Sequence, residues 1–141
     1  MSTPAPDFCV RPIGYVHSPL TDRSAAPKQG HEGAPLAWLV FDAAIREGLE
    51  NFEVGEDILV FTWLDRSRRD VLRVRPRGDP ANPMSGVFST RSPDRPNPIG
   101  LHRVTIVGIE NTLRVQVRNL EALDRTPIID VKPVLHDVAE A

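Results

Sequence analysis

Proline constrains the fold of this chain more than any other residue type, because 14 of the 141 residues are proline. Proline lacks a backbone N–H and its ring clashes with the preceding helical turn, so long helices and a four-helix bundle are strongly disfavoured. The 9 glycines are too few for a collagen-like or low-complexity chain. We therefore expect residues 1–141 to form one domain with a hydrophobic core and little helix.

Six of the prolines crowd into residues 76–98, which we call the proline segment. This segment cannot form a helix or a central strand, but its prolines preorganise the backbone and lower the entropic cost of one fixed shape. It carries Arg91 and Arg95. Composition alone leaves two interpretations equally open, a binding element or a rigid surface connection.

The formal net charge of −2 hides an uneven distribution. Residues 65–103 contain nine arginines, four aspartates and no lysine, a formal charge of +5, and the rest of the chain carries −7. The planar guanidinium group suits phosphates, carboxylates and stacked bases better than an ammonium group does. Arg66, Arg68 and Arg69 therefore form either a solvated turn or a contact to an RNA backbone, and RNA binding would weaken steeply with salt.

The single cysteine and the N-terminal residues indicate the cellular compartment in which the protein is expected. Cys9 is the single cysteine, so no intramolecular disulfide is possible and a reducing environment is expected. The first ten residues, MSTPAPDFCV, lack the basic and apolar regions of a signal peptide. The apolar runs are far shorter than the roughly 20 residues that span a bilayer. We expect a cytoplasmic protein without membrane contact.

Apolar periodicity predicts a β-rich domain with one short helix. Asp42 is placed to cap that helix, in which Ile45, Leu49 and Phe52 fall on one face. The run ILVFTWL at 58–64 is typical of a strand buried on both faces. Residues 110–112 suit a tight hairpin. Strands are expected at residues 8–16, 36–41, 58–64, 70–75, 103–109, 113–117 and 128–131.

The common cofactor and catalytic motifs are absent from the sequence. There is no dinucleotide-binding or P-loop glycine motif and no nucleophile elbow. The four histidines lie far apart and one cysteine cannot build a thiolate site, so no metal is expected. Pattern and spacing thus lead to a β-rich domain with an arginine-bearing proline segment, but not to a reaction.

Residues 86–101, GVFSTRSPDRPNPIGL, closely resemble the signature of the TsaA-like family, whose characterised members include TrmO-type tRNA methyltransferases. Four further blocks agree in order: IGYVHSP at 13–19, PKQ at 27–29, IREGLENF at 45–52 and LDRTPIIDVKP at 123–133. The resemblance implies an all-β, single-sheeted β-barrel with one short helix that binds S-adenosylmethionine without a Rossmann fold. It also implies a homodimer and N6-methylation of N6-threonylcarbamoyladenosine near the tRNA anticodon.

The resemblance also implies roles for individual residues. Arg91 is the first candidate to bind the cofactor's carboxylate, and Glu121 the candidate to accept hydrogen bonds from its ribose. Asp65, Asp124 or Asp130 would accept the proton that the acceptor nitrogen loses, with no reason to choose among them. The implied cofactor-binding residues are Pro27, Lys28, Gln29, Leu64, Asp65, Arg91, Leu101, Arg118, Asn119, Leu120 and Glu121, and the implied substrate-binding residues are Arg95, Asn97 and Lys132.

Structural roles compete with several of these assignments. Arg91 could instead anchor its own loop, and Asn97 could cap the proline segment through its own backbone. Asp124, Asp130 and Lys132 could form an ion-pair cluster on the last strand. Each of these alternatives stays open at the level of sequence.

The chain departs from the family pattern at four places. Leu64-Asp65 stands where the family commonly has a histidine-containing pair, and Asp94 replaces an aromatic residue. Arg125 replaces a glycine and Val134 an aromatic residue. These changes spare the cofactor side and alter the acceptor side. Two other functions therefore stay open, namely a cofactor- or RNA-binding module without turnover and a methyltransferase for a small molecule or another nucleoside.

Overall fold

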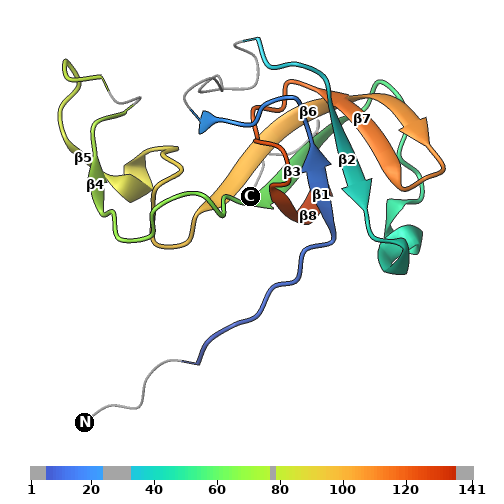
Figure 1. The fold of residues 1–141 in the computed structure, drawn as a ribbon, viewed down its shortest axis with the longest axis horizontal. Helices are drawn as coiled ribbons and strands as arrows, with labels where there is room; N and C mark the ends of the chain where they lie inside the picture. The colour runs from blue at the N-terminus through green and yellow to red at the C-terminus, as the bar shows by residue number, and fades with distance from the viewer. Residues whose placement is uncertain (1–5, 24–32, 77–78, 136–141) are drawn as a thin grey trace.

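The computed structural model describes residues 6–23, 33–76 and 79–135, and its body is built from six antiparallel strands (Figure 1). They are β1 (Gly14–His17), β2 (Ala37–Phe41), β3 (Asp57–Trp63), β6 (Ile99–Glu110), β7 (Arg114–Arg118) and β8 (Pro127–Pro133). Hydrogen-bonded neighbours follow the order β1-β2-β7-β6-β3-β8, and β1 also pairs with β8, so the sheet closes into a barrel. The prediction of a β-rich domain with a short helix is confirmed.

Strict alternation of side chains explains these strands. In β7, Val115 and Val117 are fully buried, whereas Arg114 lies on the outer face with its guanidinium 4.8 Å from the ring centre of Trp38. β3 alternates in the same way, with Thr62 facing inward. The prediction that residues 58–64 are buried on both faces is therefore wrong, because a closed barrel gives each strand one interior side.

β6 is long enough to pair with two neighbouring strands, one after the other along its length. Its first part pairs with β3, from Ile99 opposite Trp63 to Thr105 opposite Asp57. Its second part pairs with β7, beginning with Thr105 opposite Arg118. Such stagger between neighbouring strands is what closes a sheet into a barrel. Figure 1 shows β6 as the long strand that crosses the body of the protein.

The predicted helix forms as a 3-10 helix, η3 (Ala43–Leu49). The side chain of Asp42 accepts a hydrogen bond from the backbone N–H of Ala44 at 3.0 Å, as expected of a cap. Leu49 is buried, and Ile45 and Phe52 pack partly buried against the core. The helix lies beside the end of the barrel at which β3 begins (Figure 1).

Three strand predictions are wrong in extent. The strand expected at 103–109 begins earlier, because β6 already pairs with β3 from Ile99. Residues 8–12 do not join the sheet, and Phe8 is 89% exposed. Contact with the barrel begins at Ile13, whose backbone N–H donates to the carbonyl oxygen of Ile128 at 2.7 Å. Within residues 70–75 only β4 (Arg73–Val74) forms, pairing with β5 (Ser85–Gly86) in a separate two-stranded sheet. Leu72, which precedes this short strand, is 64% exposed.

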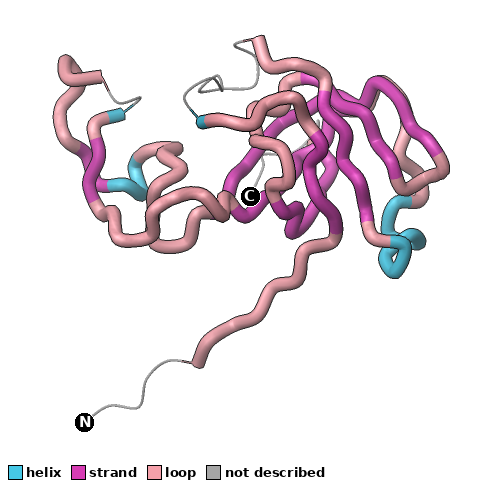
Figure 2. Tube along the Cα trace, viewed as in Figure 1, coloured by secondary structure: helices cyan, strands magenta, loops and turns pink. Residues whose placement is uncertain are grey.

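The proline segment forms most of a lobe beside the barrel. It contains β5 and a short 3-10 helix, η5 (Val87–Ser89). The prediction that this segment cannot form a helix is therefore wrong for these three residues, which lie between Pro83 and Pro93. Figure 2 shows that loops make up most of this lobe. No helix among residues 6–23, 33–76 and 79–135 is long and apolar enough to cross a membrane.

Candidate functional site

Arginine side chains from the turn after β3 hold the proline segment in place. Arg69 donates from Nε to the carbonyl oxygen of Pro96 at 2.6 Å and from Nη2 to Oδ1 of Asn97 at 2.9 Å. Its guanidinium also lies 5.2 Å from the centre of the Trp63 ring. The backbone N–H of Leu64 donates to the carbonyl oxygen of Pro98 at 2.8 Å. The end of β3 and residues 96–98 are therefore bound together as one unit.

Arg66 and Arg68 have different roles. Arg66 donates to the carbonyl oxygens of Thr21 at 2.9 Å and Asp124 at 3.3 Å, so it joins two further segments to the turn. Arg68 forms a bidentate pair with Asp70, with both distances 3.0 Å, and both side chains are exposed. Arg66 therefore acts as a structural link, and Arg68 matches the predicted solvated turn.

Arg95 gives the proline segment its internal order. Its guanidinium donates to the carbonyl oxygens of Ser92 at 2.7 Å and Val87 at 2.9 Å, and also to that of Thr90. Its backbone N–H donates to the carbonyl oxygen of Arg68 at 3.0 Å. Arg95, implied to bind substrate, thus turns its donors onto its own chain. Asn97, from the same implied set, is likewise engaged through Oδ1 with Arg69.

Asp94, one of the departures from the family pattern, joins three segments. Its Oδ1 accepts from the backbone N–H of Arg68 at 2.9 Å and from Nη1 of Arg23 at 3.2 Å. Partial burial alone would raise the pKa of the Asp94 carboxyl, but the hydrogen bonds from Arg68 and Arg23 and their charges outweigh it and lower the pKa. The extra negative charge is therefore neutralised locally and stabilises the fold around the proline segment.

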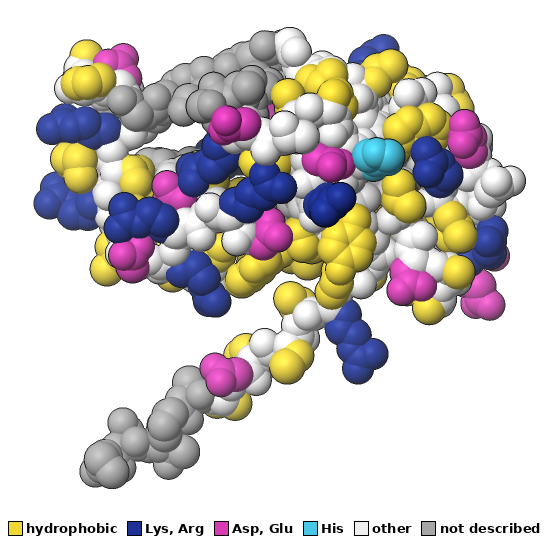
Figure 3. All heavy atoms as spheres, viewed as in Figure 1, with side chains coloured by type: hydrophobic (Ala, Val, Ile, Leu, Met, Phe, Trp, Pro, Cys, Tyr) yellow, Lys and Arg dark blue, Asp and Glu magenta, His cyan; other side chains and the backbone are white. Residues whose placement is uncertain are grey.

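Arg91 differs from most of its neighbours. Its side chain is exposed and makes no hydrogen bond or ion pair with the described residues. Among the described arginines between residues 65 and 103, Arg73 alone shares this condition. Figure 3 shows arginine and lysine side chains over the lobe and the adjacent barrel, interleaved with acidic ones. Within the described chain, the Arg91 guanidinium thus has no partner, although it stands on a segment that Arg69 and Arg95 immobilise.

A buried polar network connects β3, β6 and the segment that follows β7. Oγ1 of Thr62 lies 2.7 Å from Nε2 of His102, and Nδ1 of His102 lies 2.6 Å from Oε1 of Glu121. Thr62 is 0% and His102 5% exposed, while the Glu121 side chain retains 21%. A Cβ at Gly100 would clash with Thr62 Oγ1 and lie 2.6 Å from His102 Nε2, so this network needs glycine there.

Sequence reasoning missed His102 because it treated the four histidines as isolated residues. The signal was present in β6, where Gly100, His102, Val104 and Ile106 alternate with outward residues. That register places the imidazole inside the barrel, where a polar group requires partners. An inward histidine in a strand therefore predicts polar side chains facing it.

Residues 118–121 leave β7 in a bent path that separates their side chains. Arg118 is exposed at the end of β7, opposite Thr105. Asn119 has a φ of 71°, in the left-handed region, which redirects the chain. Leu120 is 0% exposed and anchors the turn in the core, so that Glu121 reaches His102. Of these four implied cofactor residues, only Glu121 is both polar and joined to the network.

The three candidate proton acceptors lie in different surroundings. Oδ1 of Asp124 accepts from the backbone N–H of Ser18 at 3.0 Å, which makes Asp124 a structural group. Asp130 lies 3.7 Å from Nζ of Lys132, so two of the three members of the alternative ion-pair cluster do meet. Asp65 is exposed, directly follows Leu64, and its carboxylate has no partner within the described part of the chain.

The remaining implied residues fall in two groups. Leu101 lies on the outer face of β6 and is 39% exposed. Pro27, Lys28 and Gln29 lie outside the described residues. Within residues 6–23, 33–76 and 79–135, no group of three or more histidine, cysteine, aspartate or glutamate side chains could hold a metal ion.

Several of the implied cofactor residues keep atoms that make no hydrogen bond or ion pair with the described part of the chain. Arg91 offers a guanidinium for a carboxylate or phosphate, and Leu64 and Leu101 offer apolar contact. Glu121 uses Oε1 for His102, which leaves its second oxygen to accept from hydroxyl groups. These side chains thus offer a cation, apolar surface and a carboxylate oxygen.

Comparisons with known proteins agree with that chemistry. Residues 15–139 match the family described as the tRNA-methyltransferase O N-terminal domain. A probable S-adenosyl-L-methionine-binding protein of Methanothermobacter thermautotrophicus is 41% identical over 129 residues, 92% of this chain and 91% of the relative. The S-adenosyl-L-methionine-binding protein of Archaeoglobus fulgidus is 42% identical over 123 residues, 87% of this chain and 86% of the relative.

Solved structures show the same fold. TrmO from P. aeruginosa superimposes with a TM-score of 0.75 and 27% sequence identity over 99% of this chain. This chain spans 62% of that TrmO chain.

Proposed function

Because the chain belongs to the family of the tRNA-methyltransferase O N-terminal domain, we propose that it is an S-adenosylmethionine-dependent methyltransferase. We propose further that it N6-methylates N6-threonylcarbamoyladenosine near the tRNA anticodon. The names of the relatives from Methanothermobacter and Archaeoglobus support the cofactor. The observation that carries the proposal is the Arg91 guanidinium, which has no partner among the described residues, on a segment that Arg69 and Arg95 hold in shape.

Three parts of the site would hold the cofactor. Arg91 binds its carboxylate with a charge-assisted hydrogen bond, and Leu64 and Leu101 contact the adenine ring. Glu121, held by His102, accepts from the ribose hydroxyls. When bound, S-adenosylmethionine supplies a methyl group activated by the adjacent sulfonium.

Asp65 is the proton acceptor in this proposal. The acceptor nitrogen must lose a proton, and a carboxylate can take it directly or through a water molecule. Asp124 is engaged with the backbone of Ser18, and Asp130 with Lys132, whereas the Asp65 carboxylate is exposed and has no partner among the described residues. Methyl transfer is an in-line displacement, so the fixed position of residues 64 and 65 beside Pro98 contributes through orientation.

The tRNA partner and the homodimer belong to the same proposal. The formal charge of +5 on residues 65–103 attracts a polyanion through its field even though most of the arginines make internal contacts. The outer face of β3 and β6 carries the half-buried Phe61 and Trp63 beside Ile99 and Leu101, which are 47% and 39% exposed. We propose that a second copy covers this apolar face, which places the cofactor near the subunit interface.

A binding module without turnover is the second candidate function. Leu64-Asp65 replaces the histidine-containing pair usual in the family, and relatives are named for binding rather than for transfer. A methyltransferase for a small molecule or another nucleoside would explain the same departures.

Two measurements separate these functions. In calorimetry the methyltransferase proposal expects S-adenosylmethionine to bind, and the absence of binding at high micromolar concentration would reject it. The protein is then incubated with the cofactor and bulk tRNA from cells that lack the modification, and nucleosides are analysed by mass spectrometry. Methylated threonylcarbamoyladenosine supports the tRNA activity. Cofactor binding without that product supports the module or another acceptor.

A further inference from the structure

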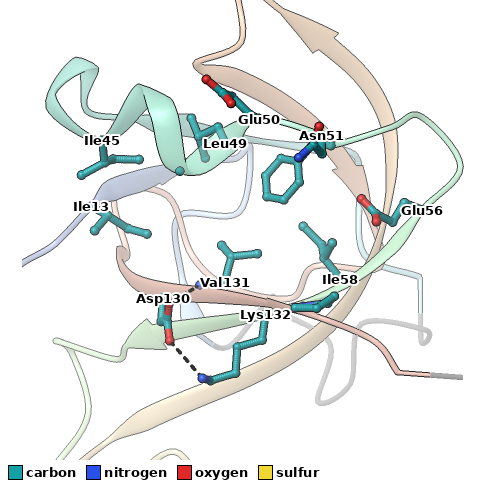
Figure 4. A pocket seen from close by; sticks show the side chains of 13 residues that line it. Ile13, Ile45, Leu49, Glu50, Asn51, Glu56, Ile58, Asp130, Val131 and Lys132 are labelled. Carbon is teal, nitrogen blue, oxygen red and sulfur yellow. Dashed lines mark hydrogen bonds and ion pairs between the residues drawn. The ribbon is translucent and has the colours of Figure 1, made fainter. Parts of the chain in front are cut away.

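A pocket opens at the end of the barrel where β3 begins, beside η3. Its volume is about 410 Å³, within the range of small-molecule sites. Leu64, at the candidate site, follows the opposite end of β3. A strand rises about 3.3 Å per residue, so Leu64 lies about 20 Å from Ile58, and the pocket is separate from the candidate site. Figure 4 shows apolar side chains around the hollow. The apolar lining consists of Ile13, Ile45, Leu49, Phe52, Ile58 and Val131.

Glu56 brings an unpaired acceptor to this apolar pocket. Its Oε1 is buried and has no hydrogen-bond partner among the described residues. A buried carboxylate oxygen without a donor costs free energy. The backbone of Glu56 is fixed by its carbonyl oxygen, which accepts from the N–H of Ile106 at 2.9 Å. Figure 4 shows the Glu56 carboxylate beside the pocket, facing the apolar wall.

The charges around the pocket are mostly negative. Glu50, Glu56 and Asp130 contribute carboxylates, and Lys132 the one ammonium group among the lining residues. Nζ of Lys132 lies 3.7 Å from Oδ2 of Asp130 and points away from the hollow in Figure 4, so it leaves Glu56 unpaired.

The cation on η3 does not compensate Glu56 either. Arg46 donates to the carbonyl oxygen of Asn111 at 3.1 Å, which directs its guanidinium toward the β6–β7 turn. The pocket therefore combines an apolar wall with an excess of negative charge and an acceptor that no side chain of the described residues satisfies.

We propose that this pocket binds a small amphipathic cation, an organic amine with an apolar body. The ammonium group pairs with the Glu56 carboxylate, which lines the pocket, and the apolar body packs against Ile13, Ile45 and Val131. An anion would meet three carboxylates, and a neutral apolar molecule would leave Glu56 unsatisfied. This site is separate from the proposed methyltransferase site, so either proposal can fail alone.

The test uses phenethylamine and its neutral analogue 2-phenylethanol. Each is titrated into the full chain labelled at isoleucine and valine methyl groups, and chemical shifts are followed by NMR. We expect saturable shifts at Ile13, Ile45 and Val131 with the amine, and binding of the alcohol at least about fivefold weaker, as loss of a charged hydrogen bond predicts. Equal binding of both compounds, or no saturation with the amine, overturns the proposal.

Variants at Glu56 separate a specific bond from general attraction. Glu56→Gln keeps the shape and removes the charge, so amine affinity should fall about fivefold or more while the alcohol is unaffected. Glu50→Gln, at an exposed rim position, is the matched control and should change affinity less than about twofold. An equal fall in both variants overturns the proposal.

If Glu56→Gln fails to fold, Glu56→Asp keeps the charge and withdraws the carboxylate by one methylene. Weaker amine binding at unchanged alcohol binding supports the bond to Glu56. Unchanged amine binding in a folded Glu56→Asp protein contradicts it.

Discussion

Nδ1 of His102 lies 2.6 Å from Oε1 of Glu121, and Nε2 of the same ring lies 2.7 Å from Oγ1 of Thr62. One imidazole thus connects two neighbouring strands of the barrel to the segment that follows β7. Both ring nitrogens are occupied, so the orientation of the ring and of the Glu121 carboxylate is fixed.

Replacing His102 with phenylalanine should therefore destabilise the fold. The ring stays roughly the same size, but Thr62 and Glu121 lose their partners, at a cost of about 2 kcal/mol in the free energy of unfolding. His17→Phe, at an exposed position of β1, is the control and should change it by less than about 0.5 kcal/mol. Urea unfolding measures both. A His102→Phe protein as stable as the parent would show that the network contributes nothing.

Arg91→Ala should weaken S-adenosylmethionine binding about tenfold or more, the scale of one charged hydrogen bond. Calorimetry on the folded protein measures the dissociation constant. Arg73→Ala is the matched control, because Arg73 is also exposed and makes no side-chain hydrogen bond or ion pair within the described chain. The proposal requires Arg91→Ala to raise the dissociation constant of S-adenosylmethionine more than Arg73→Ala does. An equal loss in both would point to the general positive field, and an unchanged Arg91→Ala protein would reject its role.

Asp65→Asn should lower the methyl-transfer rate by about 10²- to 10⁴-fold while cofactor binding stays nearly unchanged, because a general base acts in the chemical step. Single-turnover transfer to unmodified tRNA measures the rate. Asp130→Asn is the control and should retain activity, since Asp130 is paired with Lys132 at 3.7 Å. Loss of activity in Asp130→Asn alone would move the assignment to that residue.

Asp94 links acid stability to the proline segment. Its lowered pKa means that its stabilising contribution is complete above the unfolded value, about 3.9, and is lost as pH falls through the folded value. Asp94→Asn should cost about 1–2 kcal/mol at pH 7 and less at pH 3. Asp70→Asn, which removes an exposed pair, should change stability little. Urea unfolding at both pH values tests this, and a cost independent of pH would exclude the charge as its origin.

Local patterns in the sequence predicted the barrel strands well. The alternation in residues 114–118 indicates both a strand and its buried face. The run at 58–64 indicates a strand, but its unbroken apolar character does not show which face is buried. The same logic failed at residues 8–12, where apolar side chains occur but no strand pairs with them. Propensity cannot show whether a partner strand is within reach.

Contacts between distant segments could not be predicted. Arg69 meets Asn97 across 28 positions, and Arg66 meets Asp124 across 58. Charge counting left these guanidinium groups either solvated or in contact with RNA, because it cannot show which carbonyl oxygens lie nearby. The +5 charge of residues 65–103 is real, but much of its hydrogen-bonding capacity stabilises the chain itself.

Gly100→Ala offers the sharpest test of the packing around the buried network. A Cβ there would lie 2.6 Å from His102 Nε2 and closer still to Thr62 Oγ1, and both side chains are buried, so neither can move freely. We expect a loss of about 2 kcal/mol or more, the scale of overpacking a core. Gly86→Ala is the matched control, because a Cβ at Gly86 meets nothing within 4 Å. If urea unfolding finds the two variants equally stable, the close approach of Gly100 to the network is wrong.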